Sequence, residues 1–242
     1  MPHDRFFLDA LLDKDVSLTG DELYHLSRVM RKKEGDRVEL VNGKGMLAEG
    51  VISSLSKGEA KIHITFSKIV EPLLPPIHLV QALPKMSHLE MVVQKGTELG
   101  ASHFHLYPSA LSEKKELSPN QWKRLQTIII GAMKQCGRLD LPSLSWGFPP
   151  LEGNAYFGDL SPSAVPLKNV SLPATIIIGP EKGFTHKEVE ELRKKAKGVL
   201  FSPYTLRAET AAIAALAVLA NNTIYTAHDS KLGFSLHQHL DL

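Results

Sequence analysis

The sequence predicts an α/β protein in which a small β-barrel precedes a mostly parallel sheet covered by helices. Short segments of alternating polarity, separated by hairpin-type turns, occupy the first part of the chain. Strands and helices alternate in the longer second part, which is typical of a parallel sheet with helices on its faces. The two parts meet at the proline-rich stretch EPLLPPI, residues 71–77. We therefore predict two domains, residues 1–71 and residues 72–242.

Three segments are the predicted strands of the barrel, and the turns NGKG and SKGEA separate them. A helix interrupts these strands. A capping box formed by Thr19 and Glu22 predicts where the helix begins. Leu23, Leu26 and Met30 follow at helical spacing, so they are expected to face the barrel core. The predicted strands are RVELV (37–41), MLAEGVISSL (46–55) and KIHITF (61–66).

Five apolar segments are the predicted strands of the second domain. They are short, and TIII is an unbroken run of β-branched residues, which suits a sheet covered on both faces. The predicted strands are IHLVQAL (77–83), SHFHLY (102–107), AYFG (155–158), TIII (175–178) and VLF (199–201).

Four helices are predicted among these strands. Capping boxes, a proline in the first turn and glycines beyond the last turn mark their ends. The last helix, ETAAIAALAVLANNTIY (209–225), holds so many small residues that it is expected to pack closely on another element. The other signals are Ser87 with Glu90 and Gly100, then Ser118 with Pro119, Gln121 and Gly137, then Thr185 with Glu188.

Composition limits the class of protein only loosely. Lysine and arginine exceed aspartate and glutamate by two (28 − 26 = +2), which neither requires nor excludes nucleic acid. The single cysteine, Cys136, excludes an internal disulfide and a cysteine-rich zinc site. No apolar run approaches the ~18 residues of a membrane span, and the N-terminus does not resemble a signal peptide. We expect a cytoplasmic protein without membrane contact.

Two further patterns argue against a metal site and a dinucleotide site. The histidines show no H-x-x-x-H or H-E-x-x-H spacing, so we expect no metal. The stretch GKGMLA (43–48) fits G-x-G-x-x-A, but a strand follows it where a dinucleotide-binding unit needs a helix. A hairpin turn is the better interpretation.

The loop GPEKGF (179–184) joins a buried strand to a helix. In open α/β sheets, this junction is where small ligands bind, because loop amides and the helix N-terminus present free donors. The loop lacks the G-x-x-x-x-G-K-[ST] pattern of a nucleotide triphosphatase. A tight connection without a ligand would explain it equally well when taken alone.

A second loop favours a ligand. The stretch SPYTLRAETAAIAAL leads from a strand into the small-residue helix, with Arg207 and Glu209 at the helix entrance. The two loops could together enclose a flat, mostly apolar ligand by means of backbone donors and acceptors.

These motifs together resemble one family. GPEKGF, LRAETAAIAAL, LEMVVQKGTELG and AMKQCGRLDLP are similar to segments of the ribosomal small-subunit methyltransferase E family. RFF, HLSRVMRKKEGD and VNGKG fall where that family has similar residues in a PUA-like N-terminal barrel. The resemblance covers nearly the whole chain, and its motifs are specific in combination.

The resemblance implies a particular fold and activity. Members of this family are 16S ribosomal RNA uridine N3-methyltransferases of the SPOUT, or α/β-knot, superfamily. It implies a trefoil knot in the C-terminal half, S-adenosylmethionine bound by the knot loops, a homodimer, and 16S ribosomal RNA of the small subunit as the substrate. Nine positions would bind the cofactor: Ile178, Gly179, Pro180, Glu181, Gly183, Leu206, Arg207, Glu209 and Thr210.

This chain departs from the family pattern at three positions. Lys182 stands where the family usually has glycine, and Ala208 where it usually has threonine. Cys136 stands where serine is common. We do not expect this cysteine to act as a nucleophile, because a ring nitrogen can attack a methyl group directly, and we expect it to be buried.

Methylation at N3 requires removal of a proton and stabilisation of the resulting anion. We expect Arg138, and secondarily Arg207, to stabilise this charge or to position a phosphate, because a guanidinium can do both. Gln135 would read a base edge. Glu181 or Glu209 is a candidate proton acceptor, although we favour a role for both in organising the loops.

The barrel is the expected RNA-binding part. The run Arg28, Arg31, Lys32 and Lys33 would contact phosphates, together with Arg5 and His25. A solvated helix face is the alternative explanation of this run.

Two other functions fit the motifs less well. One is a SPOUT ribose 2′-O-methyltransferase, which would share the pocket but lack the barrel. The other is a non-catalytic RNA-binding or ribosome-assembly protein that keeps the fold. The sequence leaves open which uridine is modified and whether the substrate is free RNA or an assembled subunit.

Overall fold

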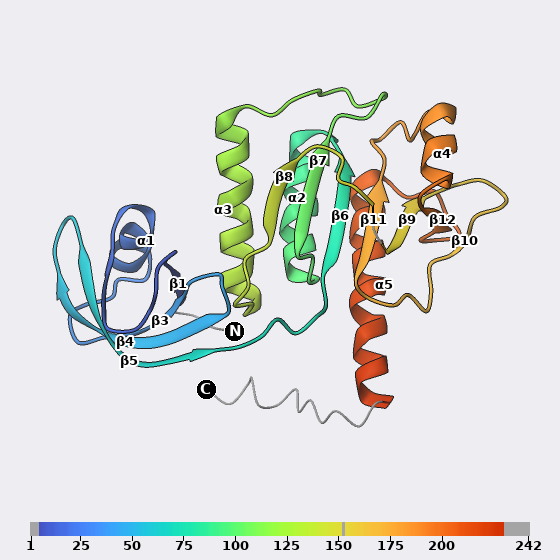
Figure 1. Cartoon of the computed structure of the whole chain (residues 1–242). Coiled ribbons are helices and arrows are strands. Elements are labelled where there is room, and N and C mark those ends of the chain that lie inside the picture. The colour runs from blue at the N-terminus through green and yellow to red at the C-terminus, as the bar shows by residue number, and fades with distance from the viewer. Residues whose placement is uncertain (1–4, 152, 230–242) are drawn as a thin grey trace. The chain divides into compact units, whose positions relative to one another are not determined.

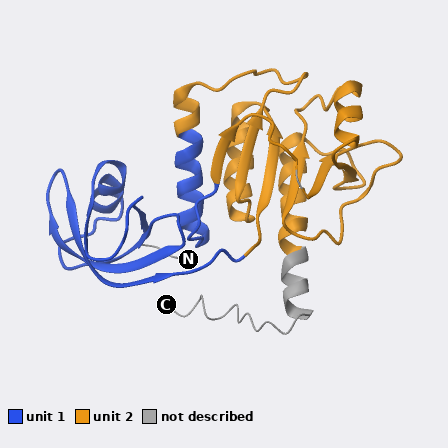
Figure 2. Cartoon of the chain, viewed as in Figure 1, with its two compact units in different colours: residues 1–73, 124–142 blue, residues 74–123, 143–242 orange. Residues whose placement is uncertain are grey.

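The computed structural model describes residues 5–151 and 153–229. The chain forms two compact units, residues 1–73 with 124–142 and residues 74–123 with 143–242 (Figure 2). The helix α3 (Pro119–Cys136) contributes to both units. The predicted boundary at residue 71 stays a prediction.

The first unit contains a five-stranded sheet that curls on itself (Figure 1). Its strand order is β1-β3-β4-β5-β2, with β1 parallel to β3 and the other pairs antiparallel. This curled sheet is consistent with the predicted barrel. A Cβ atom at Gly50 would meet Ile62 Cγ2 at 2.5 Å, so glycine allows the two long strands to meet there. The strands are β1 (Arg5–Phe7), β2 (Asp15–Leu18), β3 (Arg37–Val41), β4 (Met46–Leu55) and β5 (Ala60–Ile69).

The predicted barrel helix consists of α1 (Gly20–Tyr24) and the π-helical turn η1 (His25–Val29). Leu23 and Leu26 are buried in the barrel core, as their spacing predicted. The predicted capping box is wrong, because Thr19 makes no side-chain cap. The Glu22 carboxylate instead accepts the Phe7 amide at 3.2 Å and Lys134 Nζ at 2.6 Å. A capping box would use the Glu22 carboxylate, but donors from two distant segments of the chain bind it instead.

The C-terminal part of α3 packs within the first unit. Met133 is buried with Val41 and Leu47, and Phe7 and Leu139 pack against this cluster. The helix ends at Cys136, directly before Gly137, whose φ of +89° confirms the predicted stop signal.

The second unit contains a seven-stranded sheet in the order β10-β12-β9-β11-β6-β7-β8. Every paired strand in it is parallel, which confirms the predicted mostly parallel sheet. All five residues of β11 are buried, as the branched run predicted. The strands are β6 (Ile77–Ala82), β7 (His103–Tyr107), β8 (Ser143–Trp146), β9 (Asn154–Gly158), β10 (Val165–Pro166), β11 (Ala174–Ile178) and β12 (Lys197–Leu200).

Helices α2 (Met86–Glu98) and α5 (Ala208–Asp229) pack against each other and against the sheet (Figure 1). A Cβ atom at Gly96 would lie 2.6 Å from the Phe104 ring and 3.2 Å from Leu216 Cδ1. The close packing expected of the small-residue helix is therefore confirmed. On the other face, Leu192 of α4 (His186–Arg193) packs with Ile177 and other strand residues.

The predicted helix starts are partly confirmed. Thr185 and Glu188 form the capping box at α4, and Ser118 and Gln121 exchange hydrogen bonds at the start of α3. The box expected at Ser87 is wrong: Lys85 precedes α2, and its side chain makes no cap. Within the described ranges, no helix has both the length and the apolar character needed to cross a membrane.

Candidate cofactor and RNA sites

The loop after β11 folds into a tight turn. The Gly183 amide donates to the Pro180 carbonyl at 2.8 Å, and Gly183 has a φ of +73°, which favours glycine. A Cβ atom at Gly179 would lie 3.3 Å from the Phe184 ring. Lys182 occupies the outer side of the turn, with its Nζ 3.7 Å from Glu113 and both side chains exposed. The lysine that departs from the family pattern therefore does not disturb the turn.

Glu181 joins this loop to the start of α2. Its carboxylate accepts the Lys85 backbone amide at 2.9 Å. Burial alone would raise the pKa of Glu181, but the Lys85 amide and the neighbouring His88 outweigh it and hold the pKa below its usual range. Glu181 is therefore an anion at neutral pH, and it supplies the cap that the Ser87 box was expected to give.

His88 lies between the two predicted cofactor loops. Its Nδ1 is 3.4 Å from Glu181 Oε1 and 3.6 Å from Glu209 Oε2. Glu209 is almost fully buried, and both Nδ1 of His88 and Oε2 of Glu209 are buried without a hydrogen-bond partner among the described residues. No sequence pattern indicated His88. A histidine in the first turn of a helix that follows a parallel strand was the available signal.

Gln81 is a second site residue that no sequence pattern indicated. It is fully buried at the end of β6; its Nε2 donates to the Ala82 carbonyl at 2.8 Å and lies 3.5 Å from the Gly179 carbonyl. Its Oε1 is buried and has no hydrogen-bond partner within residues 5–151 and 153–229. Since buried polar atoms are normally hydrogen-bonded, these atoms are available to a ligand or a water at this edge of the sheet. An amide within an otherwise apolar strand was the signal.

The other predicted cofactor residues lie on the same two connections. Ile178 is buried at the end of β11, and Pro180 is buried next to Gly179. Ala208, another departure from the family pattern, is buried as the first residue of α5. Leu206 is partly exposed, whereas Arg207 and Thr210 are exposed at the entrance to α5.

Three predicted residues around the end of α3 belong to the first unit. Arg138 is 14% exposed and pairs with Asp140. Gln135 and Cys136 are exposed in the last turn. The expectation that Cys136 is buried is wrong, because it is the last residue of the helix and faces outward there. The parts predicted for Arg138 and Gln135 stay predictions.

The predicted RNA-binding residues fall into two groups. Arg28, Arg31 and Lys33 are exposed, and Arg31 has a φ of +54° directly after η1 and Met30. Lys32 donates from Nζ to the Arg37 carbonyl at 3.3 Å.

Arg5 and His25 are more enclosed. Arg5 is 8% exposed, and its Nη2 lies 2.9 Å from Glu39 Oε2. The ring of His25 packs 5.5 Å from that of Phe6, and its Nδ1 is buried. The exposed residues Arg28, Arg31 and Lys33 are thus better placed to contact phosphates than Arg5 and His25.

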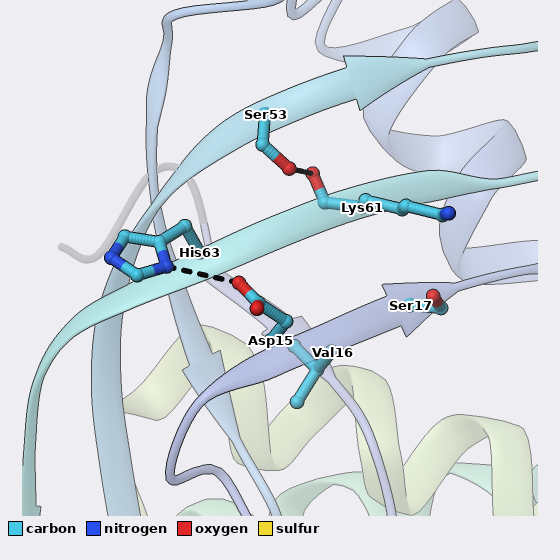
Figure 3. A pocket seen from close by; sticks show the side chains of 6 residues that line it. All are labelled: Asp15, Val16, Ser17, Ser53, Lys61 and His63. Atoms are coloured by element: carbon cyan, nitrogen blue, oxygen red, sulfur yellow. Dashed lines mark hydrogen bonds and ion pairs between the residues drawn. The ribbon is translucent and has the colours of Figure 1, made fainter.

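A shallow hollow of about 520 Å³ lies on the barrel sheet, and its lining residues are not among the predicted RNA-binding residues (Figure 3). His63 Nδ1 and Asp15 Oδ1 are 2.9 Å apart at its edge, and Ser53 Oγ donates to the Lys61 carbonyl at 3.1 Å. The carboxylate of Asp15 makes this hollow less suitable for a phosphate. It is lined by Asp15, Val16, Ser17, Ser53, Lys61 and His63.

Comparison with known proteins agrees with this arrangement. The family model described as an RNA methyltransferase domain matches residues 71–148 and 160–220, and the one described as an RNA methyltransferase PUA domain matches residues 18–65. The protein is therefore an RNA methyltransferase with a PUA domain. A relative from Aquifex aeolicus is 35% identical over 207 residues, which are 76% of this chain and 88% of the relative. That relative is a ribosomal RNA small subunit methyltransferase E, and this chain belongs to the same family.

Two solved structures are similar to most of the chain. A methyltransferase structure from Legionella pneumophila, with the cofactor SAM bound, is 27% identical with a TM-score of 0.80, covering 90% of this chain and 96% of that one. A ribosomal RNA small subunit methyltransferase E from Neisseria gonorrhoeae, bound to S-adenosyl methionine, has a TM-score of 0.82 at 24% identity, covering 92% and 98%. The predicted family and fold are confirmed.

Proposed function

We propose that the protein transfers a methyl group from S-adenosylmethionine to N3 of a uridine in small-subunit ribosomal RNA. The observation that carries this proposal is His88, which links the two loops through Glu181 and Glu209 and leaves buried polar atoms facing one edge of the sheet. Because the chain belongs to the methyltransferase E family, we interpret this edge as the binding site of S-adenosylmethionine.

The residues fit S-adenosylmethionine. Glu181 and Glu209 supply negative charge, which suits a sulfonium cation, and Gln81 offers a buried acceptor. Gly179 and Gly183 let a ligand approach the loop backbone closely. When bound, S-adenosylmethionine supplies the methyl group as an electrophile. We assign its binding to Ile178, Gly179, Pro180, Glu181, Gly183, Leu206, Arg207, Glu209 and Thr210, with Gln81 and His88 as additions.

The remaining chemistry concerns the uridine. Its N3 proton must leave, and a guanidinium stabilises the anion that forms. Arg138 is our first choice for this role and Arg207 the second, with Gln135 reading the base. The contacts of Glu181 to Lys85 and His88 support an organising role for that carboxylate rather than that of a proton acceptor.

The barrel would hold the RNA. Arg28, Arg31 and Lys33 present exposed cations from one short segment, which suits contact with phosphates. Because ribosomal RNA is modified where ribosomes form, we place the enzyme in the cytoplasm. A homodimer that acts on the 16S ribosomal RNA of the small subunit completes the proposal.

The test is a methylation assay. Small ribosomal subunits from cells that lack the modification are incubated with the protein and S-adenosylmethionine, and nucleosides from the digested RNA are identified by mass spectrometry. We expect 3-methyluridine. A 2′-O-methylated nucleoside would replace the proposal with ribose methylation. Absence of product together with absence of cofactor binding would indicate a non-catalytic RNA-binding protein.

A further inference from the structure

Three histidines lie close together on two neighbouring strands of the seven-stranded sheet. His78 lies in β6, and His103 and His105 lie in β7, where His78 is directly opposite His103. The rings are stacked: the centroids of His103 and His105 are 3.9 Å apart, and that of His78 is 5.5 Å from each. His78 and His103 are partly exposed, so solvent can reach the cluster, whereas His105 is the most enclosed of the three.

The distances in this cluster suit a metal ion. His78 Nδ1 and His105 Nε2 are 3.3 Å apart. Two nitrogens bound at about 2.0–2.1 Å to one tetrahedral ion lie roughly 3.3–3.4 Å from each other. One ring nitrogen from each of His78, His103 and His105 lies within 4.8 Å of the others. The 3.3 Å contact is a hydrogen bond between the two rings that an ion would replace, and the stacked His103 ring must rotate to direct a nitrogen at the same ion.

Two serines of β8 hold the other ring nitrogens. Ser145 Oγ lies 2.9 Å from His105 Nδ1 and 2.9 Å from His103 Nε2, and Ser143 Oγ lies 2.5 Å from His103 Nδ1. A metal-bound imidazole usually keeps its second nitrogen in a hydrogen bond, which orients the ring. His105 can keep Nδ1 on Ser145 while Nε2 binds an ion, and His103 can keep one of its two serines.

We propose that His78, His103 and His105 bind one divalent transition-metal ion of the zinc type. Three histidines with a fourth position open to water are an established donor set for zinc. The sequence patterns failed to indicate this site because its ligands come from two paired strands rather than from one helix. It is separate from the cofactor edge: His78 precedes Gln81 by three residues, which is about 10 Å along a strand. The inference is independent of the proposed function.

The experiment is a titration of the full chain with Co²⁺, which reports coordination through its visible absorption. The sequence HQH at 237–239 is a competing H-x-H pair, so the reference protein carries H237Q and H239Q. We expect one Co²⁺ per chain in the reference protein, with absorption typical of four-coordinate Co²⁺ that disappears when Zn²⁺ is added. H78Q, H103Q and H105Q, each made in this reference protein, should weaken binding by about 100-fold or more.

Two controls make the result decisive. H186Q replaces an 87% exposed histidine elsewhere and should leave Co²⁺ binding unchanged. H103C keeps a metal ligand and should bind Co²⁺ with additional thiolate absorption. Equal binding by the reference protein and H105Q would overturn the proposal, as would a reference protein that takes up no Co²⁺. If a glutamine variant fails to fold, the Zn²⁺-dependent rise in melting temperature of the reference protein decides the question, and no rise overturns the proposal.

Discussion

His88 Nδ1 lies 3.4 Å from Glu181 and 3.6 Å from Glu209, so one imidazole of α2 lies between two loops that are distant in sequence. The first loop follows β11 and the second opens α5. Removing the ring would leave two neighbouring carboxylates, one of them almost fully buried, without the group that separates them. The two loops would then no longer be held at one spacing.

H88A should therefore weaken S-adenosylmethionine binding by about tenfold or more, the equivalent of roughly 1.4 kcal/mol. Isothermal titration calorimetry with S-adenosylmethionine measures this directly. H186A is the matched control, because His186 is exposed and lies outside these loops. Equal affinity in H88A and H186A would show that the imidazole does not organise the site.

R138A separates binding from chemistry. If Arg138 stabilises the uridine anion, its removal should lower the methylation rate by about 100-fold or more while cofactor affinity stays unchanged. The control is R37A, which removes an exposed arginine of the same unit. Full activity in R138A would transfer the role to Arg207.

Charge reversal tests the RNA surface. R28E and K33E together should weaken RNA binding and reduce the slope of log affinity against log salt by about 1.4, since each phosphate contact to a single strand contributes roughly 0.7. K57E reverses an exposed charge in the turn between β4 and β5 and should have less effect. Filter binding at several salt concentrations measures both. An unchanged slope in the double variant would leave these residues as a solvated helix face.

Asp159 predicts a pH dependence of stability. It is buried at the end of β9, 3.0 Å from Arg193 Nη2, and accepts the Ser161 amide at 2.9 Å. Burial alone would raise the pKa of Asp159, but Ser161 and Arg193 outweigh it and hold the pKa below its usual value. The folded pKa is lower than the unfolded one. The stabilisation is therefore present above the unfolded pKa and is lost as the pH falls through the folded pKa.

D159N should accordingly lower the free energy of unfolding by about 1–3 kcal/mol at pH 7. The difference from the wild type should shrink as the pH falls below about 4, the usual value for aspartate. Urea unfolding at a series of pH values measures it. A difference that is independent of pH would mean that the carboxylate charge does not contribute.

Two glycine substitutions in helices should have opposite effects. G96A should lower the free energy of unfolding by about 1–3 kcal/mol, because the added Cβ would meet the buried Phe104 ring at 2.6 Å. The Cβ added by G131A in α3 meets no described residue within 4 Å, so this change should raise stability by up to about 1 kcal/mol through helix propensity. Thermal unfolding compares them. A stabilising G96A would show that α2 and α5 can move apart without cost.

Local patterns predicted the elements whose signals are local. The alternation of RVELV and MLAEGVISSL gave the bounds of β3 and β4, and the branched run TIII gave the buried centre of β11. The short strands β1 and β8 were missed because they are defined by pairing with distant segments rather than by their own pattern.

In the candidate site, too, only the parts with local sequence signals could be predicted. The loops around Gly179 and Arg207 could be found from their sequence, because turns and helix starts have local signatures. His88 and Gln81 could not, since their importance depends on the sheet order that brings β6 next to β11. The capping boxes at Thr19 and Ser87 failed for a related reason: at Glu22, donors from distant segments engage the carboxylate, and before α2 the Glu181 carboxylate reaches the Lys85 amide.

The exposed position of Cys136 has a practical consequence. As the only cysteine in the sequence, it allows a spin label to be attached at one defined point without any substitution. In the proposed homodimer, two such labels give a single distance between the subunits, which electron paramagnetic resonance can follow while cofactor or RNA is added. The natural sequence thus provides its own probe of assembly.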